Sequence, residues 1–288
     1  MNLSRTDLAV ETAEALPTGR DMFAPGTGVT KSECLLCGCP VTRIHVHTPA
    51  GARAIGKPEG RYITIDLRPA LSRQEALTGR AALCLCRELR ALLPPPSDGP
   101  ALVVGLGNRS LTADAVGPLA LPHILVTRHM LAAMPEEFAG FSSVAALATG
   151  VLGETGLESS ELIAAAAEKL RPRCIIVLDA LAAATREKLC AVLQLTDTGL
   201  TPGSGVGNHR KEVSRRTLGV PVLALGLPTV IRAEQLVGEE TPAEGEPLFV
   251  TPRDIDQRVR ELSRMMAYGI DLALQPHLTV EDITGLLG

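Results

Sequence analysis

Tryptophan is absent from the sequence, and only two tyrosines and four phenylalanines supply aromatic rings. A folded core must therefore be built mainly from alanine, leucine and valine. Few aromatic side chains remain on which the bases of single-stranded nucleic acid could stack. The formal net charge of −4 also lacks the excess of basic residues that DNA-binding domains carry. We therefore expect no nucleic-acid partner.

Long apolar runs are missing as well. No run reaches the roughly 20 residues that a membrane-spanning helix needs. Residues 1–14 lack the apolar segment of a secretory signal peptide. The seven cysteines are odd in number, and without a secretion signal we interpret them as reduced thiols. These features predict a cytoplasmic protein without a membrane partner.

Five of the cysteines form two clusters, one with Cys34, Cys37 and Cys39 and one with Cys84 and Cys86. A Cys-x2-Cys pair can hold zinc, and a second pair could complete four thiolate ligands. The second cluster, however, has only one intervening residue and lies in a predicted helix. Ordinary buried or surface thiols are the favoured interpretation, and a zinc-clamped scaffold stays the alternative.

The most informative stretch is Ala101–Pro118, ALVVGLGNRSLTADAVGP. Its short apolar run ends at a glycine turn, which is typical of a buried parallel strand. Asp114 follows in the loop. Arg173–Ala184, RCIIVLDALAAA, repeats this order and places Asp179 at the predicted carboxyl end of its strand. Ligands of open α/β sheets bind beyond the carboxyl ends of the strands, where both aspartates are predicted to lie.

Two carboxylates in one crevice do not both ionise easily, so the pKa of one of them rises. Such a pair could activate a water molecule for attack. Alternatively, Asp114 caps the following helix and Asp179 binds nearby backbone amides. No Ser/His/Asp arrangement and no H-E-x-x-H motif is recognisable.

The rest of the chain alternates between strand and helix patterns, which indicates one large α/β domain or two smaller ones. A loop with four glycines, Thr196–Asn208, could cradle an anion or a peptide carbonyl group, but it lacks the ending of a P-loop. Gly150–Gly156 is predicted to be a second glycine loop. Predicted strands are Arg43–Thr48, Arg61–Leu67, Phe141–Thr149, Leu189–Leu195 and Val220–Leu227. Predicted helices are Ser72–Leu93 (opened by a Ser72-x-x-Glu75 capping box), Gly117–Leu131 (bent at Pro122), Ser159–Leu170, Pro252–Gln275 and Thr279–Leu287.

Eight blocks together resemble the germination proteases, the endopeptidases of spore-forming bacteria. They include RTDLAVE, AIGKPEGRYITI, VVGLGN with TADAVGP, and DTGLTPGSGVGNHRKE. The blocks span nearly the whole chain in the family's order. They lie at Arg5–Glu11, Ala54–Ile65, Val103–Pro118, Val126–Met130, Gly150–Glu161, Leu178–Ala183, Asp197–Glu212 and Leu225–Val230.

This resemblance implies an endopeptidase in the spore core that degrades small acid-soluble spore proteins during germination. It also implies a homotetramer, made as a zymogen that removes its own short pro-segment, with the cut between Asp7 and Leu8. The implied fold is a sheet-centred αβα sandwich similar to the hydrogenase maturation proteases, with an extra small β-rich N-terminal portion. Residues 1–16 would form the N-terminal segment and residues 17–288 a single α/β peptidase domain. Asp114 and Asp179 match the proposed catalytic aspartates, and no cofactor or metal is implied for the peptidase.

Two other functions compete with an aspartate-dependent peptidase. In a metal-dependent peptidase, or a maturation protease for nickel enzymes, the same two aspartates would be metal ligands and a metal-bound water the nucleophile. A non-enzymatic binder, such as a zinc-clamped scaffold or nickel escort protein, would depend on the cysteine clusters instead. Chelator treatment and zinc analysis distinguish these hypotheses.

Overall fold

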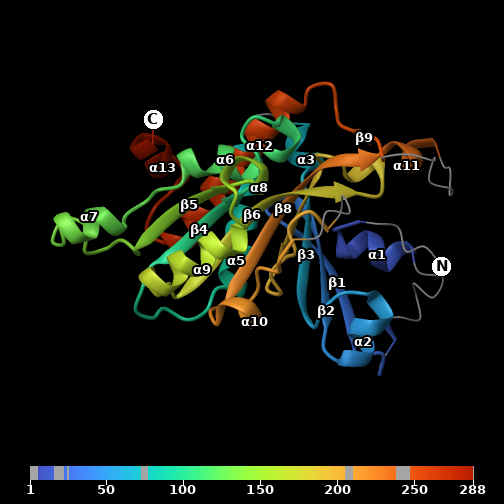
Figure 1. Ribbon diagram of the computed structural model, residues 1–288, viewed down its shortest axis with the longest axis horizontal. Helices are drawn as coiled ribbons and strands as arrows, with labels where there is room; N and C mark the ends of the chain where they lie inside the picture. Colours follow the sequence, from blue (N-terminus) through green and yellow to red (C-terminus); the bar gives the residue numbers. More distant parts are fainter. Residues whose placement is uncertain are drawn as a thin grey trace.

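The computed structural model describes residues 6–15, 23–24, 26–72, 77–204, 210–237 and 247–287. Within this part of the chain, nine strands form one sheet in the order β1-β2-β3-β7-β8-β6-β4-β5, and β9 pairs with β8 (Figure 1). The strands are β1 Val29–Leu36, β2 Cys39–Val46, β3 Gly60–Asp66, β4 Ala101–Leu106, β5 Val144–Gly150, β6 Cys174–Ala183, β7 Val192–Thr196, β8 Val222–Arg232 and β9 Phe249–Val250.

The sheet has a parallel half and an antiparallel half. Strands β5, β4, β6 and β8 run parallel to one another, whereas β1, β2, β3 and β7 continue the sheet as antiparallel neighbours. Every residue of β4 is buried, which agrees with its uninterrupted apolar sequence because helices cover both faces of a parallel sheet.

Helices form a layer on each face of the sheet. On one face α5 (Ala82–Leu92) and α12 (Ile255–Leu274) pack against inward-facing residues such as Val103 and Ile176. On the other face α9 (Ser159–Leu170) covers Leu102 and its neighbours, and in Figure 1 it lies in front of the sheet. Alternate residues of each strand thus enter opposite cores.

The antiparallel half has its own helical cover. The helices α1 (Ala9–Ala15) and α2 (Pro49–Ile55) pack against β2 and β3 through a separate apolar cluster. The predicted fold class, an αβα sandwich with a β-rich N-terminal portion, is confirmed. The predicted boundary between residues 16 and 17 lies outside the described residues.

The other described helices are short, apart from α13. They are α3 Arg68–Leu71, η2 Leu77–Ala81, η3 Thr112–Asp114, α6 Val116–Ala120, η4 Leu121–His123, α7 Arg128–Ala133, α8 Leu152–Thr155, η5 Arg186–Lys188, α10 Arg215–Leu218, α11 Ala233–Val237 and α13 Val280–Leu287. No helix of the described part has the length and apolar character that crossing a bilayer requires.

Several local predictions were wrong. The helix predicted at Gly117–Leu131 is divided into α6, η4, an extended stretch and α7; Pro122 has no N–H group to continue the helical bonding. The predicted glycine loop at Gly150–Gly156 contains the short helix α8. Strand β1 was not predicted, because most of its residues are exposed and it lacks an apolar alternation. Glu75 of the predicted capping box lies outside the described residues.

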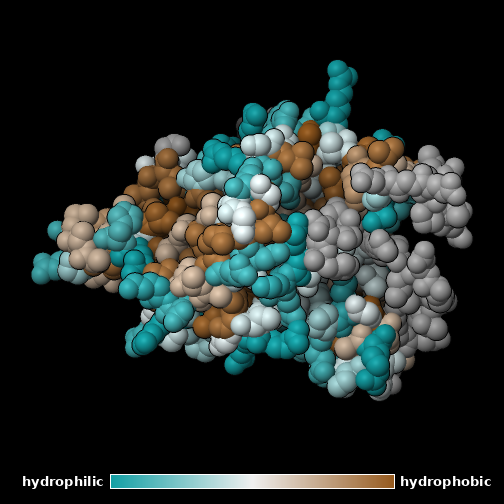
Figure 2. Space-filling model, viewed as in Figure 1, coloured by the Kyte–Doolittle hydropathy of each residue, from teal (hydrophilic) through white to brown (hydrophobic). Residues whose placement is uncertain are grey.

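Apolar side chains are also exposed at several points of the surface. In Figure 2 they gather at the end of the molecule where β5 and α13 lie. Met134, which follows α7, is 43% exposed, and Leu286 in α13 is 54% exposed. β5 is the last strand at this end of the sheet.

Helix α12 carries a fully buried carboxyl group, that of Asp271. Both of its oxygens accept the Leu125 N–H, at 3.0 and 3.1 Å. Burial raises the pKa of Asp271 to about 8, so the folded protein holds this proton at neutral pH. In the unfolded chain the group ionises near pH 4. The folded state therefore binds the extra proton between these pH values, and stability falls as the pH rises towards 8.

We expect Asp271→Asn to remove this pH dependence, since asparagine resembles the protonated carboxyl group. Between pH 5.5 and pH 8.5 the stability of the variant relative to wild type should rise by on the order of 3 kcal/mol. Urea unfolding at both pH values measures the difference. Parallel pH profiles for the two proteins would contradict the assignment.

Candidate functional site

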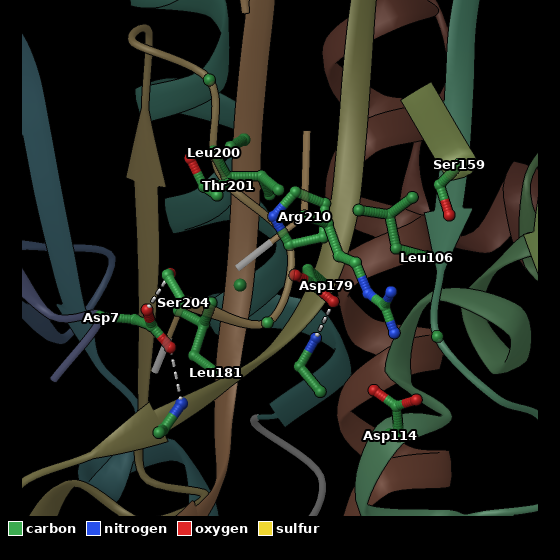
Figure 3. Close-up of a pocket in the computed structure, with 18 of the residues that line it drawn as sticks. Asp7, Leu106, Asp114, Ser159, Asp179, Leu181, Leu200, Thr201, Ser204 and Arg210 are labelled. Atoms are coloured by element: carbon green, nitrogen blue, oxygen red, sulfur yellow. Dashed lines mark hydrogen bonds between the residues drawn. The ribbon is translucent and has the colours of Figure 1, made fainter. Parts of the chain in front are cut away.

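A cavity of about 1270 Å³ opens beyond the carboxyl ends of the parallel strands. Residues that follow β4 and β5, the later parts of β6 and β8, and the loop after β7 line it. The N-terminal segment also contributes, through Asp7. The cavity contains both predicted catalytic residues, Asp114 and Asp179, and Figure 3 shows their carboxylates and that of Asp7 around it.

Asp114 lies in the loop that leaves β4, and a close turn holds it there. Gly107 has a φ of +108°, and a Cβ atom at this residue would lie 1.9 Å from the Asp114 carbonyl oxygen; only glycine fits. The Asp114 carboxylate accepts the N–H of Asn108 at 2.8 Å. From β8, the Thr229 hydroxyl donates to the Ala113 carbonyl at 2.5 Å. The alternative that Asp114 caps a helix is wrong, because its side chain makes no bond to α6.

Asp179 lies within β6, which continues to Ala183 rather than ending at the aspartate as predicted. The adjacent strand β4 pairs with β6 only as far as Leu178. Asp179 is therefore the first residue of β6 beyond its β4 neighbour, and it is 7% exposed. Its carboxylate accepts the N–H of Ala180 at 2.9 Å, which corresponds to the amide-binding alternative considered for it.

The charge of one carboxyl group affects the ionisation of the other. Burial raises the pKa of Asp179 well above its usual value, and the charges of Asp114 and Asp7 raise it further. Burial also raises the pKa of Asp114, while the Asn108 N–H lowers it. The pair can thus hold one proton while its other member stays ionised, an arrangement suited to paired acid and base chemistry.

Asp7 is held inside the same cavity. Its carboxylate accepts the Ser204 hydroxyl at 2.7 Å and the Ala182 N–H at 3.0 Å. Its carbonyl oxygen accepts Gln194 Nε2 at 2.8 Å and Lys57 Nζ at 3.1 Å. In Figure 3, Asp179 lies between Asp7 and Asp114. The Asp7 carboxylate thus binds groups that lie far along the chain.

The segment that follows Asp7 is part of the folded core. Leu8 and Ala9 are fully buried. Glu11 is 3% exposed and accepts the N–H groups of Ala184 and Thr185 at 2.7 and 2.9 Å. Buried apolar groups and a satisfied carboxylate stabilise this segment against the end of β6.

Comparison with known proteins identifies the family. The family described as "Germination protease" matches residues 8–241. A germination protease of Clostridium perfringens is 34% identical over 98% of this chain and 98% of its own length. This chain belongs to the germination protease family. It is a spore protease that hydrolyses peptide bonds of protein substrates.

Other germination proteases align over less of their own length. The Geobacillus sp. protein is 40% identical over 97% of this chain and 76% of its own, and the Bacillus subtilis protein is 39% identical over 82% and 66%. Among solved structures, a [NiFe] hydrogenase maturation protease, HycI from Thermococcus kodakarensis, shares 18% identity with a TM-score of 0.36. The alignment covers 64% of this chain and 98% of the HycI chain. The fold of this germination protease is established by its own strand order.

The three side chains that bind Asp7 were missed by sequence reasoning. Lys57 follows α2, Gln194 lies in β7, and Ser204 lies in the loop after β7. Lys57 and Ser204 each fall inside a block that resembles the family, which was the available signal. Gln194 had none, because a single polar residue in an apolar strand is a common feature.

Two further predictions concerned the glycine loop Thr196–Asn208 and the cysteines. The loop lines the cavity from Thr196 to Ser204, and its remainder, residues 205–208, lies outside the described residues. All seven cysteines are free. In the described part of the chain, no three His, Cys, Asp or Glu side chains are arranged to hold a metal ion.

Proposed function

We propose that this germination protease is an endopeptidase that degrades small acid-soluble spore proteins during germination, with Asp114 and Asp179 as its catalytic pair. The observation that supports the catalytic pair is that both carboxyl groups line one cavity. They lie close enough there for the charge of Asp114 to raise the pKa of Asp179. The proposal also includes a homotetramer in the spore core, on the basis of the resemblance.

The proposed chemistry divides two roles between the carboxyl groups. The ionised member removes a proton from a water molecule as that water attacks the peptide carbonyl carbon. The protonated member donates its proton to the carbonyl oxygen or to the leaving amine. Asp179, more deeply buried and with the more strongly raised pKa, is the acid, and Asp114 is the base.

The proposal includes self-processing of a zymogen between Asp7 and Leu8. The position of Asp7 in the same cavity supports it. Only residues 1–7 would leave, and the buried residues from Leu8 onwards would remain with the fold.

Incubation with a purified small acid-soluble spore protein, with mapping of the cuts by mass spectrometry, tests the proposed substrate. We expect discrete cuts, and we expect the rate to change less than twofold in a metal chelator such as EDTA, because two carboxyl groups alone supply the acid and the base. Chelator-dependent activity that returns on adding a divalent cation would favour the metal-dependent peptidase. An uncut substrate would contradict the proposed specificity.

A further inference from the structure

One face of the antiparallel half of the sheet is only partly covered by helix. Helix α5 packs on the face that carries Arg43, whose Nε donates to the Glu88 carboxylate of α5 at 2.9 Å. Farther along the strands, the Arg61 guanidinium donates to the carbonyl of Ala91 at 3.2 Å, in the last turn of α5. The helix ends at this row of residues. Side chains that continue the same face beyond it are open to solvent.

Two histidines of β2 occupy this open part of the face. Side chains two residues apart point to the same face of a strand, so His45 and His47 follow Arg43 on the face that α5 covers elsewhere. Their ring centroids are 3.7 Å apart, and their ring planes are inclined by 41°. His45 is half-buried and His47 is exposed. An ion from solution can therefore reach both rings.

The two rings are close enough for their nitrogens to share one ion. A zinc–nitrogen bond is about 2.1 Å long, so two nitrogens on the same ion lie at most about 4.2 Å apart. Rings with this centroid separation can meet that limit by rotation of the exposed His47 ring. The Thr30 hydroxyl lies 2.9 Å from His47 Nε2, which leaves Nδ1 of this ring for an ion. Histidine ligands of metals generally bind a fixed polar group through their other nitrogen.

The charges around the pair are compatible with a bound cation. Burial lowers the pKa of His45, and the charge of His47 lowers it further. His45 is therefore unprotonated at neutral pH and keeps a nitrogen lone pair for a metal. Arg61, the neighbour of His45 across β3, is paired through its Nε with the Asp197 carboxylate at 2.7 Å. The carboxylate balances the positive charge that would otherwise repel an ion.

We propose that His45 and His47 bind one divalent transition-metal ion, of the class of Zn²⁺, Ni²⁺ and Cu²⁺, with water molecules completing its coordination. Imidazole nitrogen is a preferred ligand of these ions, whereas Mg²⁺ and Ca²⁺ prefer oxygen. Neither histidine is among the described residues that line the cavity of Asp114 and Asp179. The site is thus separate from the proposed peptidase chemistry, and with two protein ligands it exchanges its ion readily.

Zinc titration of the full chain tests this site. The protein carries no affinity tag, and Cys34→Ser and Cys37→Ser remove the two thiols that are not buried and could bind zinc themselves. Isothermal titration calorimetry near neutral pH gives the stoichiometry and the dissociation constant for Zn²⁺. The same titration with Mg²⁺ is the control for the class of metal.

We expect one Zn²⁺ to bind per chain and Mg²⁺ to give no heat of binding. His45→Gln and His47→Gln should each weaken Zn²⁺ binding at least about tenfold, because a single imidazole remains. The matched change His129→Gln, at an exposed histidine of α7, should leave the affinity unchanged. Circular dichroism verifies that each variant is folded.

Nuclear magnetic resonance of the imidazole rings provides a second measurement, which needs no substitution at the histidines. On addition of Zn²⁺ the ring signals of His45 and His47 should shift together, while those of His129 stay in place. Absence of zinc binding, an affinity that neither His45→Gln nor His47→Gln lowers, or ring signals that do not respond to Zn²⁺ would overturn the site.

Discussion

Asp179→Asn is expected to lower the kcat/KM for peptide cleavage by a factor of about 10³–10⁴, the upper part of the range for loss of a general acid or base. Asparagine keeps the volume of the side chain but neither donates nor accepts the catalytic proton. Asp114→Asn should cause a comparable loss, because the two carboxyl groups act as a unit and their effects are not additive. The double variant should therefore be little worse than either single one.

The fold should survive this change. Burial raises the pKa of Asp179 above its value in the unfolded chain, so ionisation of this group opposes folding as the pH rises towards the folded pKa. Asp179→Asn should consequently be at least as stable as wild type at pH 7, as measured by thermal unfolding. Asp98→Asn, at an exposed loop residue, is the matched control and should keep full activity. Turnover near the wild-type rate in either active-site variant would remove that residue from the mechanism.

Acidification is expected to accelerate self-cleavage between Asp7 and Leu8. The proposed chemistry needs one protonated and one ionised carboxyl group, and the raised pKa values of Asp179 and Asp114 mean that lowering the pH populates this state. The rate should rise as the pH falls through the higher pKa of the pair. It should fall again at lower pH, where both groups are protonated.

N-terminal sequencing after incubation over a range of pH values measures this step. Wild type should yield a product that begins at Leu8, whereas Asp114→Asn should yield none, and Asp98→Asn should behave as wild type. Dilution at constant pH distinguishes cleavage within one molecule, whose rate is independent of concentration, from cleavage between molecules. An intact Met1 terminus in protein that already degrades substrate would refute the processing proposal.

Much of the fold, and the position of Asp114 and Asp179 in one cavity, could be predicted from the sequence because their signals are local. The apolar runs before Asp114 and Asp179 predicted two buried strands, and the pattern of Ser159–Leu170 predicted α9 with its observed limits. A glycine turn after an apolar run, and an aspartate close behind the run, are likewise recognisable within a few residues of sequence. The eight blocks that resemble the germination proteases extended the prediction of fold and family to nearly the whole chain.

Other features depended on contacts between distant segments. The long helix predicted at Gly117–Leu131 is divided, and the Leu125 N–H in its extended part is bound by Asp271, 146 residues later. Asp7 meets Ser204 and Ala182, 197 and 175 residues away, and no local pattern encodes such a pairing. Only the tertiary structure shows that the pairing of β4 with β6 ends at Leu178. That end opens the edge of β6 to Asp7, because hydrogen-bonding groups that lose one strand neighbour must find another partner.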